Sequence, residues 1–168
     1  MKNPIEGLVI HCSDSAFGSA TLIKSWHTDP KPKGRGWADI GYHIVICNGL
    51  VENNTFMDFM DGAIEWGRDI DQDGAHTIGW NNLAGLCLIG ESGEFTISQL
   101  ESTRRVILYL IENHGLDPEK IYAHADLDKR KPYCPGIKDF KKFIQKCVNL
   151  ESLNEFVGRV NPISEDID

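Results

Sequence analysis

The chain has 168 residues, of which 41% are hydrophobic and 25% are charged, and these proportions suit a single soluble globular domain. Lys and Arg number 17 while Asp and Glu number 25, and the resulting net charge of −8 disfavours nonspecific binding to nucleic acid or anionic lipid. No apolar run approaches the roughly 20 residues that a membrane span needs, so we expect no membrane insertion.

The predicted elements of the first half begin with a short buried strand. Leu8–Cys12 is a run of apolar and β-branched residues that polar residues stop, which is typical of such a strand. Leu22–His27 predicts the end of a short helix, and Thr28–Asp39 predicts a loop because it contains two prolines and two glycines. Tyr42–Val51 predicts a hairpin that turns at Asn48-Gly49.

The second half continues the alternation of strands and helices. The apolar run Ala84–Gly90 predicts a strand covered on both faces. Ser98 can cap the following helix with Glu101 as its capping-box partner, and Gly115 ends that helix. Ile121–Ala123 predicts a further strand. This order of elements predicts an α/β domain with a central mixed β-sheet flanked by helices.

The C-terminal part combines one clear helix with an acidic segment. Apolar residues at helical spacing after Pro135-Gly136 predict the helix; they are Ile137, Phe140, Phe143, Ile144 and Cys147. Asn149–Asp168 holds five acidic residues against Arg159 and shows weak periodicity. We therefore expect one functional domain over residues 1–148 and a partly ordered acidic tail over residues 149–168.

The N-terminus and the cysteines indicate where the chain is made. Met1–Gly7 carries Lys2 and Glu6 and precedes only a short apolar run, which does not fit a secretory signal. The five cysteines are odd in number and widely spread, which favours free thiols over a disulfide framework. We expect synthesis in the cytoplasm.

Three residues form a candidate metal site. His11 lies inside an apolar strand, where an imidazole needs a hydrogen-bond partner or a metal. His124 follows the predicted strand Ile121–Ala123, and Cys134 comes ten residues later. Two imidazoles and a thiolate can make an open zinc site with water in the fourth position. Spacing alone also allows a hydrogen-bonded core histidine.

A second metal pattern occurs in an acidic loop. Asp69, Asp71 and Asp73 precede Gly74 as in the opening of an EF-hand calcium loop. The twelfth position of that loop needs a bidentate Glu, and here it is Trp80. We therefore interpret the run mainly as a solvated acidic loop.

Ordered segments of the chain resemble the zinc-dependent N-acetylmuramoyl-L-alanine amidases of the phage T7 lysozyme type, relatives of the peptidoglycan recognition proteins. The resemblance spans about residues 7–147 and depends on the joint order of the segments and the position of the histidines. The segments are LVIHCSDS at 8–15, WHTD at 26–29, GWADIGYHIVI at 36–46, GAHTIGWN at 74–81 with GLCLIGE at 85–91, and HAD at 124–126 with CPG at 134–136.

The resemblance implies roles for the matching residues. His11, His124 and Cys134 correspond to the three zinc ligands of the family, at one edge of a cleft. Tyr42 corresponds to a tyrosine beside the zinc-bound water that assists catalysis. The resemblance thus implies Zn²⁺ as the cofactor.

The catalytic lysine matches less well. Family members place it two residues before the cysteine, where this chain has Pro132. Lys131 is our choice for the lysine that stabilises the oxyanion, and Lys129 is the alternative. Zinc together with the basic run 129–131 predicts a locally positive catalytic end.

Further residues are expected to contact substrate. His76 matches a histidine that lines the cleft of the family, and Trp80 and Asn81 follow it closely. His43 follows Tyr42 directly on a predicted strand, so it faces the opposite side and is expected to be structural.

The implied activity is hydrolysis of the amide between N-acetylmuramic acid and L-alanine, with peptidoglycan as the partner of a monomeric enzyme. A chain without a signal sequence fits a phage endolysin or a similar bacteriolytic enzyme that reaches the wall once the membrane is permeabilised. The alternatives are a non-catalytic peptidoglycan recognition module, a cytosolic muropeptide-recycling amidase, and a cysteine hydrolase that uses Cys12 or Cys134.

Overall fold

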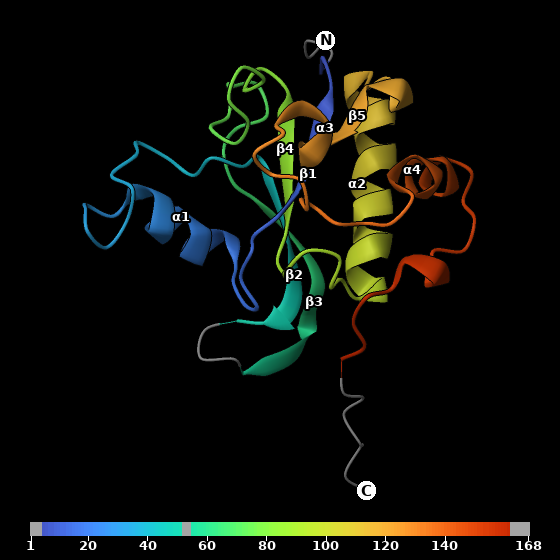
Figure 1. Ribbon diagram of the computed structural model, residues 1–168, viewed down its shortest axis with the longest axis horizontal. Helices are drawn as coiled ribbons and strands as arrows, with labels where there is room; N and C mark the ends of the chain where they lie inside the picture. Colours follow the sequence, from blue (N-terminus) through green and yellow to red (C-terminus); the bar gives the residue numbers. More distant parts are fainter. Residues whose placement is uncertain (1–4, 52–54, 162–168) are drawn as a thin grey trace, which may run out of the picture.

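Strands and helices alternate along the chain in the computed structural model, which describes residues 5–51 and 55–161 (Figure 1). The strands are β1 (Leu8–Cys12), β2 (Ile44–Leu50), β3 (Phe56–Trp66), β4 (Ala84–Leu88) and β5 (Ile121–Ala123). The α-helices are α1 (Ala20–Thr28), α2 (Ile97–His114), α3 (His124–Leu127) and α4 (Phe140–Val148). Two short 3₁₀ helices are η2 (Pro118–Lys120) and η3 (Asn154–Phe156).

The five strands form one mixed sheet in the order β3-β2-β4-β1-β5. β1 pairs in parallel with β4 and with β5, and β2 pairs in parallel with β4. Only the pairing of β2 with β3 is antiparallel among these. The predicted α/β class with a central mixed sheet is therefore confirmed.

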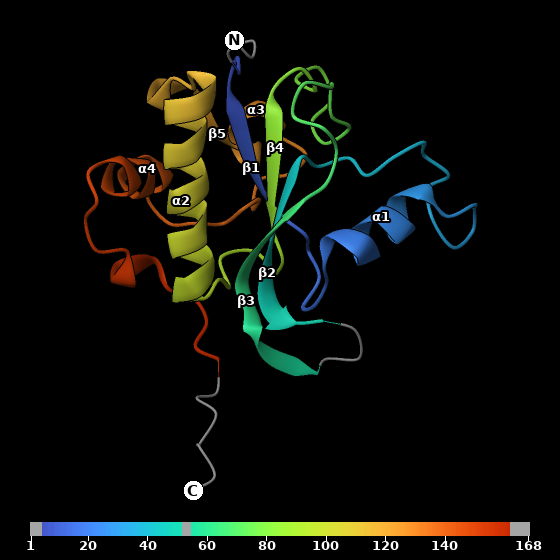
Figure 2. The ribbon, with the colours of Figure 1, turned by 180° about the vertical axis from the view of Figure 1, so that it is seen from behind.

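Helices lie on both sides of the sheet (Figures 1 and 2). α2 and α4 cover one face, where Ile10 of β1 and Ile107 of α2 belong to the larger core cluster. α1 lies on the other side, where Ile23 packs with Val45 and Cys87. Because successive strand residues point to opposite faces, His11 lies on the α1 side of β1. No helix within residues 5–51 and 55–161 has the length and apolar character needed to cross a membrane.

The hairpin of β2 and β3 does not turn where the sequence predicts it. Asn48 and Gly49 lie within β2, and Asn48 pairs with Asp61 between two shifts in register. Gly49 has a φ of +84°, and the side-chain amide of Asn48 donates to the Ala16 carbonyl at 2.9 Å. The expected turn at Asn48-Gly49 is wrong, because the positive φ serves a bulge that lets the strand continue.

The cap of α2 also differs from the prediction. Thr96, not Ser98, is the N-cap, and its capping-box partner is Gln99 rather than Glu101. Both pairs fit the same pattern, but only Gln99 is buried, with its amide donating to backbone carbonyls of the sheet region. The predicted end at Gly115 is confirmed, since Gly115 adopts the left-handed conformation there.

Packing against the domain continues after residue 148. Leu153 is fully buried and Phe156 is 8% exposed, and both belong to the core cluster under α2 and α4. The ring of Phe156 meets that of Phe143 edge-on, with centroids 5.3 Å apart. Two apolar side chains therefore attach this acidic segment to the core, beyond the boundary expected at residue 148. Residues 162–168 of the expected tail lie outside the described residues.

Candidate metal centre and cleft

His11 and His124 lie at the carboxyl ends of neighbouring parallel strands. Ile10 of β1 pairs with Ala123 of β5, so the residues that follow each of them meet at the same edge of the sheet. His11 is 1% exposed and His124 is 7% exposed. Parallel pairing thus brings together two histidines that are 113 residues apart.

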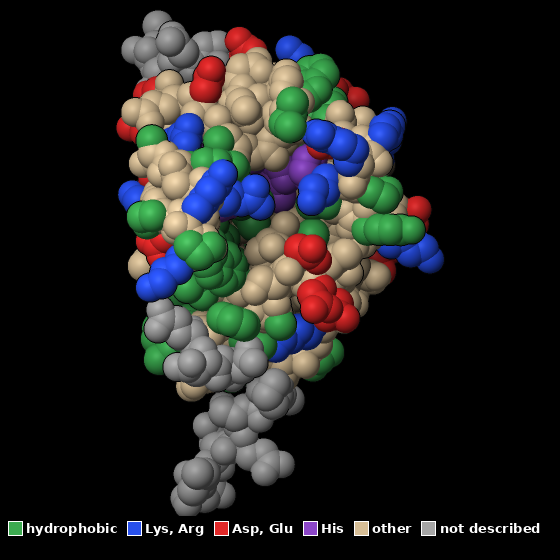
Figure 3. All heavy atoms as spheres, turned by 60° about the vertical axis from the view of Figure 1, so that its left-hand side comes forward, with side chains coloured by type: hydrophobic (Ala, Val, Ile, Leu, Met, Phe, Trp, Pro, Cys, Tyr) green, Lys and Arg blue, Asp and Glu red, His purple; other side chains and the backbone are tan. Residues whose placement is uncertain are grey.

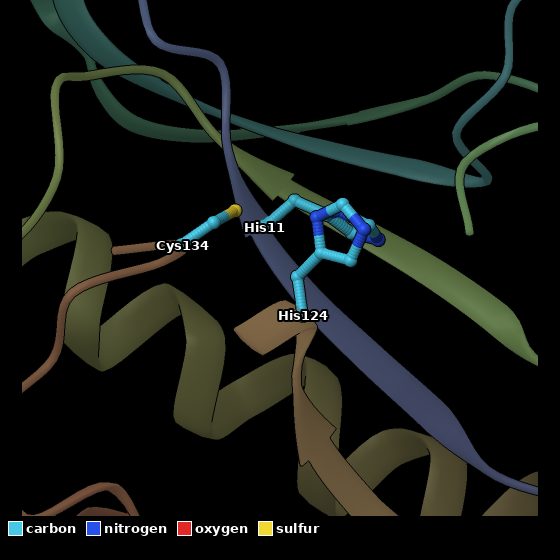
Figure 4. A group of neighbouring side chains, drawn as sticks. All are labelled: His11, His124 and Cys134. Carbon is cyan, nitrogen blue, oxygen red and sulfur yellow. The ribbon is translucent and has the colours of Figure 1, made fainter. Parts of the chain in front are cut away.

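A loop returns Cys134 to the same edge. The Ala125 N–H donates to the Cys134 carbonyl at 2.9 Å, and the Cys12 N–H donates to the Cys134 Sγ at 3.3 Å. The Ser92 hydroxyl donates to the carbonyl of Tyr133 next to it. These bonds hold the loop so that the sulfur faces the two imidazoles (Figure 4).

The three side chains can hold a metal ion. The Nδ1 atoms of His11 and His124 are 3.1 Å apart, and one ligand atom from each of the two histidines and Cys134 lies within 4.8 Å of the others. Two nitrogens on a tetrahedral Zn²⁺ lie roughly 3.3 Å apart, given Zn–N bonds of about 2.0–2.1 Å. Nitrogen and sulfur donors are those that Zn²⁺ prefers, so the residues present fit zinc.

No second metal-binding group occurs within the described ranges 5–51 and 55–161. The acidic loop with Asp69, Asp71 and Asp73 is not gathered into such a group. The structure therefore gives no support to the calcium interpretation.

The protonation state of the two histidines suits metal ligation. Burial is the main cause that lowers the pKa of His11 and of His124, so both imidazoles are neutral near pH 7. A hydrogen bond with the Cys12 thiol, together with burial, raises the pKa of Cys134. The thiol must therefore release its proton when a metal binds.

The carboxylate of Asp128 lies near the ring of His124. Nε2 of His124 is 3.9 Å from Oδ2 of Asp128 and has no hydrogen-bond partner among the described residues. Asp128 is itself held by Arg130, whose Nε and Nη2 donate to its two oxygens at 2.9 and 2.8 Å. Carboxylates in this position commonly orient ligating histidines.

The three side chains border a cleft formed by two adjoining cavities of about 420 and 550 Å³. His11, His124 and Cys134 line the first cavity. The residues that line both cavities are Arg35, Tyr42, His124, Arg130 and Lys131. Figure 3 shows histidine side chains at the bottom of a hollow with Lys and Arg side chains around its rim. This agrees with the locally positive end that the sequence predicts on an acidic protein.

Tyr42 lies beside the three side chains of the candidate metal site. Its ring centroid is 5.1 Å from that of His11, and it lines both cavities. Burial raises the pKa of Tyr42 well above its usual range. The phenol therefore keeps its proton at neutral pH and can act as a hydrogen-bond donor.

The two candidate lysines differ in position. Lys131 lines both cavities, and its charge contributes to the lowered pKa of His124. Lys129 lines neither cavity, and its Nζ donates to the Ala125 carbonyl at 3.2 Å.

The three residues expected to contact substrate do not all line the cleft. His76 and Asn81 line the second cavity, but the Asn81 side-chain oxygen accepts hydrogen bonds from the N–H groups of His76 and Thr77, each at 2.9 Å. Trp80 is 43% exposed and lines neither of the two cavities. His76 also contacts His11, at 3.0 Å between Nδ1 of His76 and Nε2 of His11.

The loop 29–39 after α1 supplies two cleft residues that sequence reasoning missed. Arg35 lines both cavities and Trp37 lines the second. The Arg35 guanidinium lies 5.0 Å from the ring centre of Trp37, a cation–π contact. The signal available in the sequence was an aromatic residue close to an arginine in a polar loop, where neither side chain is expected to be buried in the core.

Known proteins are similar to this chain in sequence and in fold. Residues 1–137 match the family described as N-acetylmuramoyl-L-alanine amidase. The endolysin of Escherichia phage T7 is 29% identical over 156 residues, which cover 86% of this chain and 89% of the relative.

Two solved structures extend the comparison. The N-acetylmuramoyl-L-alanine amidase LysC from Clostridium intestinale URNW aligns with a TM-score of 0.67 at 23% identity. The alignment covers 89% of this chain and 88% of the LysC chain. A chain of the complex of the peptidoglycan recognition proteins LCa and LCx with tracheal cytotoxin aligns with a TM-score of 0.65 at 25% identity, and the alignment covers 87% of this chain and 84% of that chain.

The chain therefore belongs to the N-acetylmuramoyl-L-alanine amidase family. The resemblance to the phage T7 lysozyme type is confirmed, and the protein is a phage-type peptidoglycan amidase.

Proposed function

We propose that this chain is a zinc-dependent endolysin that hydrolyses the amide between N-acetylmuramic acid and L-alanine. The observation that carries the zinc dependence is the convergence of His11, His124 and Cys134 at the wall of the cleft. All residues with a proposed chemical role lie within residues 1–148, which we take as the catalytic part of the chain.

The metal and the protein side chains divide the chemistry. His11, His124 and Cys134 would hold Zn²⁺, which when bound polarises the amide carbonyl and lowers the pKa of a coordinated water to about 7. Lys131 lines both cavities, as His124 does, so its ammonium group is placed to stabilise the negative charge that develops on the carbonyl oxygen. Tyr42 remains protonated and orients the attacking water or the leaving amine by donating a hydrogen bond.

His76 and Asn81 form part of the wall of the second cavity, where the substrate would extend. We propose that Trp80, which lies on the surface nearby in sequence, contacts the glycan or the stem peptide outside the two cavities. Peptidoglycan is the proposed partner of a monomeric enzyme, made in the cytoplasm and admitted to the wall when the membrane is permeabilised.

Product analysis tests the reaction. Intact sacculi digested with the zinc-loaded chain should give unbroken glycan strands and stem peptides with a new N-terminal alanine, detected by mass spectrometry. Cys134→Ala should abolish both the product and stoichiometric zinc binding. New reducing sugars in place of free stem peptides would exclude an amidase.

Two further measurements separate the alternatives. A recycling amidase would prefer soluble anhydro-muropeptides to sacculi, whereas an endolysin should release peptides from sacculi. A recognition module would bind peptidoglycan without releasing peptide, and a cysteine hydrolase would keep its activity in a chelator and lose it to a thiol alkylator.

A further inference from the structure

Both ring nitrogens of His11 have a neighbour. Nδ1 faces Nδ1 of His124 at 3.1 Å within the metal cluster. Nε2 faces away from the cluster and lies 3.0 Å from Nδ1 of His76 and 3.4 Å from the hydroxyl oxygen of Thr77. A neutral histidine that coordinates a metal through Nδ1 must carry its hydrogen on Nε2. That hydrogen points at His76.

The hydrogen bond on the other side of the His76 ring determines which of its nitrogens carries the hydrogen. Nε2 of His76 lies 2.9 Å from the backbone carbonyl of Leu83, and a carbonyl can only accept. The hydrogen of the neutral His76 ring is therefore on Nε2, which leaves Nδ1 as the acceptor for His11. The result is a directed chain from His11 through His76 to Leu83.

The ring of His76 has little freedom to move. A Cβ atom added at Gly74 would lie 2.4 Å from Cδ2 of His76, and one added at Gly85 would lie 2.5 Å from the same atom. The backbone of His76 is held in addition by the side chain of Asn81. The absence of a side chain at Gly74 and Gly85 thus leaves the space that the His76 imidazole occupies next to His11.

We propose that His76 is a positioning residue that holds His11 in the tautomer with Nδ1 free for the metal. This inference rests on the proposed zinc dependence of the amidase. Hydrogen bonds of this kind orient a ligating histidine and increase its basicity, and their loss commonly weakens metal binding by 10–100-fold. The Thr77 hydroxyl oxygen, 3.4 Å from Nε2 of His11, is placed to accept part of this hydrogen bond when His76 is removed.

The test combines tautomer and metal measurements on the full chain. In the metal-free wild type, ¹⁵N NMR of the histidine side chains should show the hydrogen of His11 on Nε2. The double variant His76→Ala/Thr77→Val should show both tautomers of His11, and its zinc affinity, measured by competition with a chelator, should fall roughly 10–100-fold. His76→Asn keeps an acceptor near the position of Nδ1 and should recover much of the affinity.

His43 provides the matched control. It is a buried histidine that, like His76, uses both ring nitrogens in hydrogen bonds, here to the Gln72 carbonyl and from the Gly85 N–H, but it contacts no proposed ligand. His43→Asn should leave zinc affinity and the His11 tautomer unchanged. A hydrogen on Nδ1 of wild-type His11, or unchanged zinc affinity in the double variant, would overturn the proposal. A wild type that binds no zinc would instead overturn the zinc dependence, while the tautomer of metal-free His11 still judges the role of His76.

Discussion

The Sγ atoms of Cys12 and Cys134 lie 3.6 Å apart at the wall of the cleft. The Cys12 N–H also donates to the Cys134 sulfur, so one β1 residue contacts the proposed ligand twice. Cys12 is half-buried and both thiols are free. This pair makes the metal ligand accessible to thiol chemistry.

We predict that glutathione disulfide oxidises the metal-free chain at this pair. A thiolate attacks the reagent and releases one glutathione, and the second cysteine displaces the other glutathione to form the Cys12–Cys134 disulfide. Zinc binding should then be lost, because the sulfur is no longer a thiolate. The measurements are the thiol count, which should fall from five to three, and zinc content before and after a reductant.

Cys12→Ser is the control for this oxidation. It keeps the backbone N–H that faces Cys134 and removes the partner thiol, so it should retain zinc after the same treatment once mixed disulfides are reduced mildly. Zinc loaded beforehand should protect the wild type. Equal loss of zinc in wild type and Cys12→Ser would show that the pair is not the reactive unit.

Lys131 and Lys129 form a second matched pair. We expect Lys131→Ala to lower kcat roughly 100-fold, since loss of one group that stabilises an oxyanion costs about that much. Lys129→Ala should have little effect, because Lys129 lines neither cavity. The measurement is peptide release from sacculi at saturating substrate, with zinc content shown equal in both variants. The reverse ranking would assign the role to Lys129.

Much of the site could be predicted from local patterns. The apolar strand with His11 and the strand that ends before His124 are short, clear signals, and parallel pairing of β1 with β5 then brings their ends together. The spacing of the two histidines could not show this, because strand order is a tertiary property. The ordered motifs supplied that missing information.

Other features depend on tertiary contacts that the sequence does not display. Arg35 and Trp37 line the cleft although no local pattern marks their loop as part of it, and Cys12 lines the first cavity although it ends an apolar strand. Asn48-Gly49 has the composition of a turn, but Asn48 pairs with Asp61 of β3 and its side-chain amide donates to the Ala16 carbonyl, so the strand continues through a bulge. These positions depend on residues that are distant in the sequence, which local patterns do not show.

His27 should make stability depend on pH. Burial, with smaller contributions from Arg35 and Arg68, lowers the pKa of His27 from 6.5 to about 4. The folded chain therefore keeps the ring neutral between these values while the unfolded chain binds a proton, so stability is lost as pH falls from about 6.5 to 4. The full difference corresponds to at most about 3 kcal/mol at pH 4.

Urea unfolding at pH 7 and pH 4.5 checks this contribution. His27→Asn keeps an acceptor for the Gly41 N–H, which donates to Nδ1 of His27 at 3.0 Å, but cannot titrate. The variant should lose less free energy of unfolding than the wild type between the two pH values. An identical loss in both proteins would assign the acid sensitivity to other groups.

Leu153 and Phe156 should decide whether the acidic C-terminal segment belongs to the folded unit. Leu153 is fully buried, and the ring of Phe156 packs on Phe143 of α4, so removing either side chain leaves a cavity in the core. Leu153→Ala should lower the free energy of unfolding by about 2–5 kcal/mol and Phe156→Ala by about 3–5 kcal/mol. The exposed neighbour Asn154 offers the control, since Asn154→Ala removes no buried surface.

Activity separates this structural contribution from a catalytic one. The segment lines neither cavity of the cleft, so the folded fraction of each variant should release peptide at the wild-type rate at low temperature. Truncation after Asn149 should lower stability at least as much as Leu153→Ala, because it removes both apolar side chains together. Full stability in the truncated chain would show that these contacts contribute nothing. A truncated chain that is folded and binds zinc but is inactive would place the segment in catalysis.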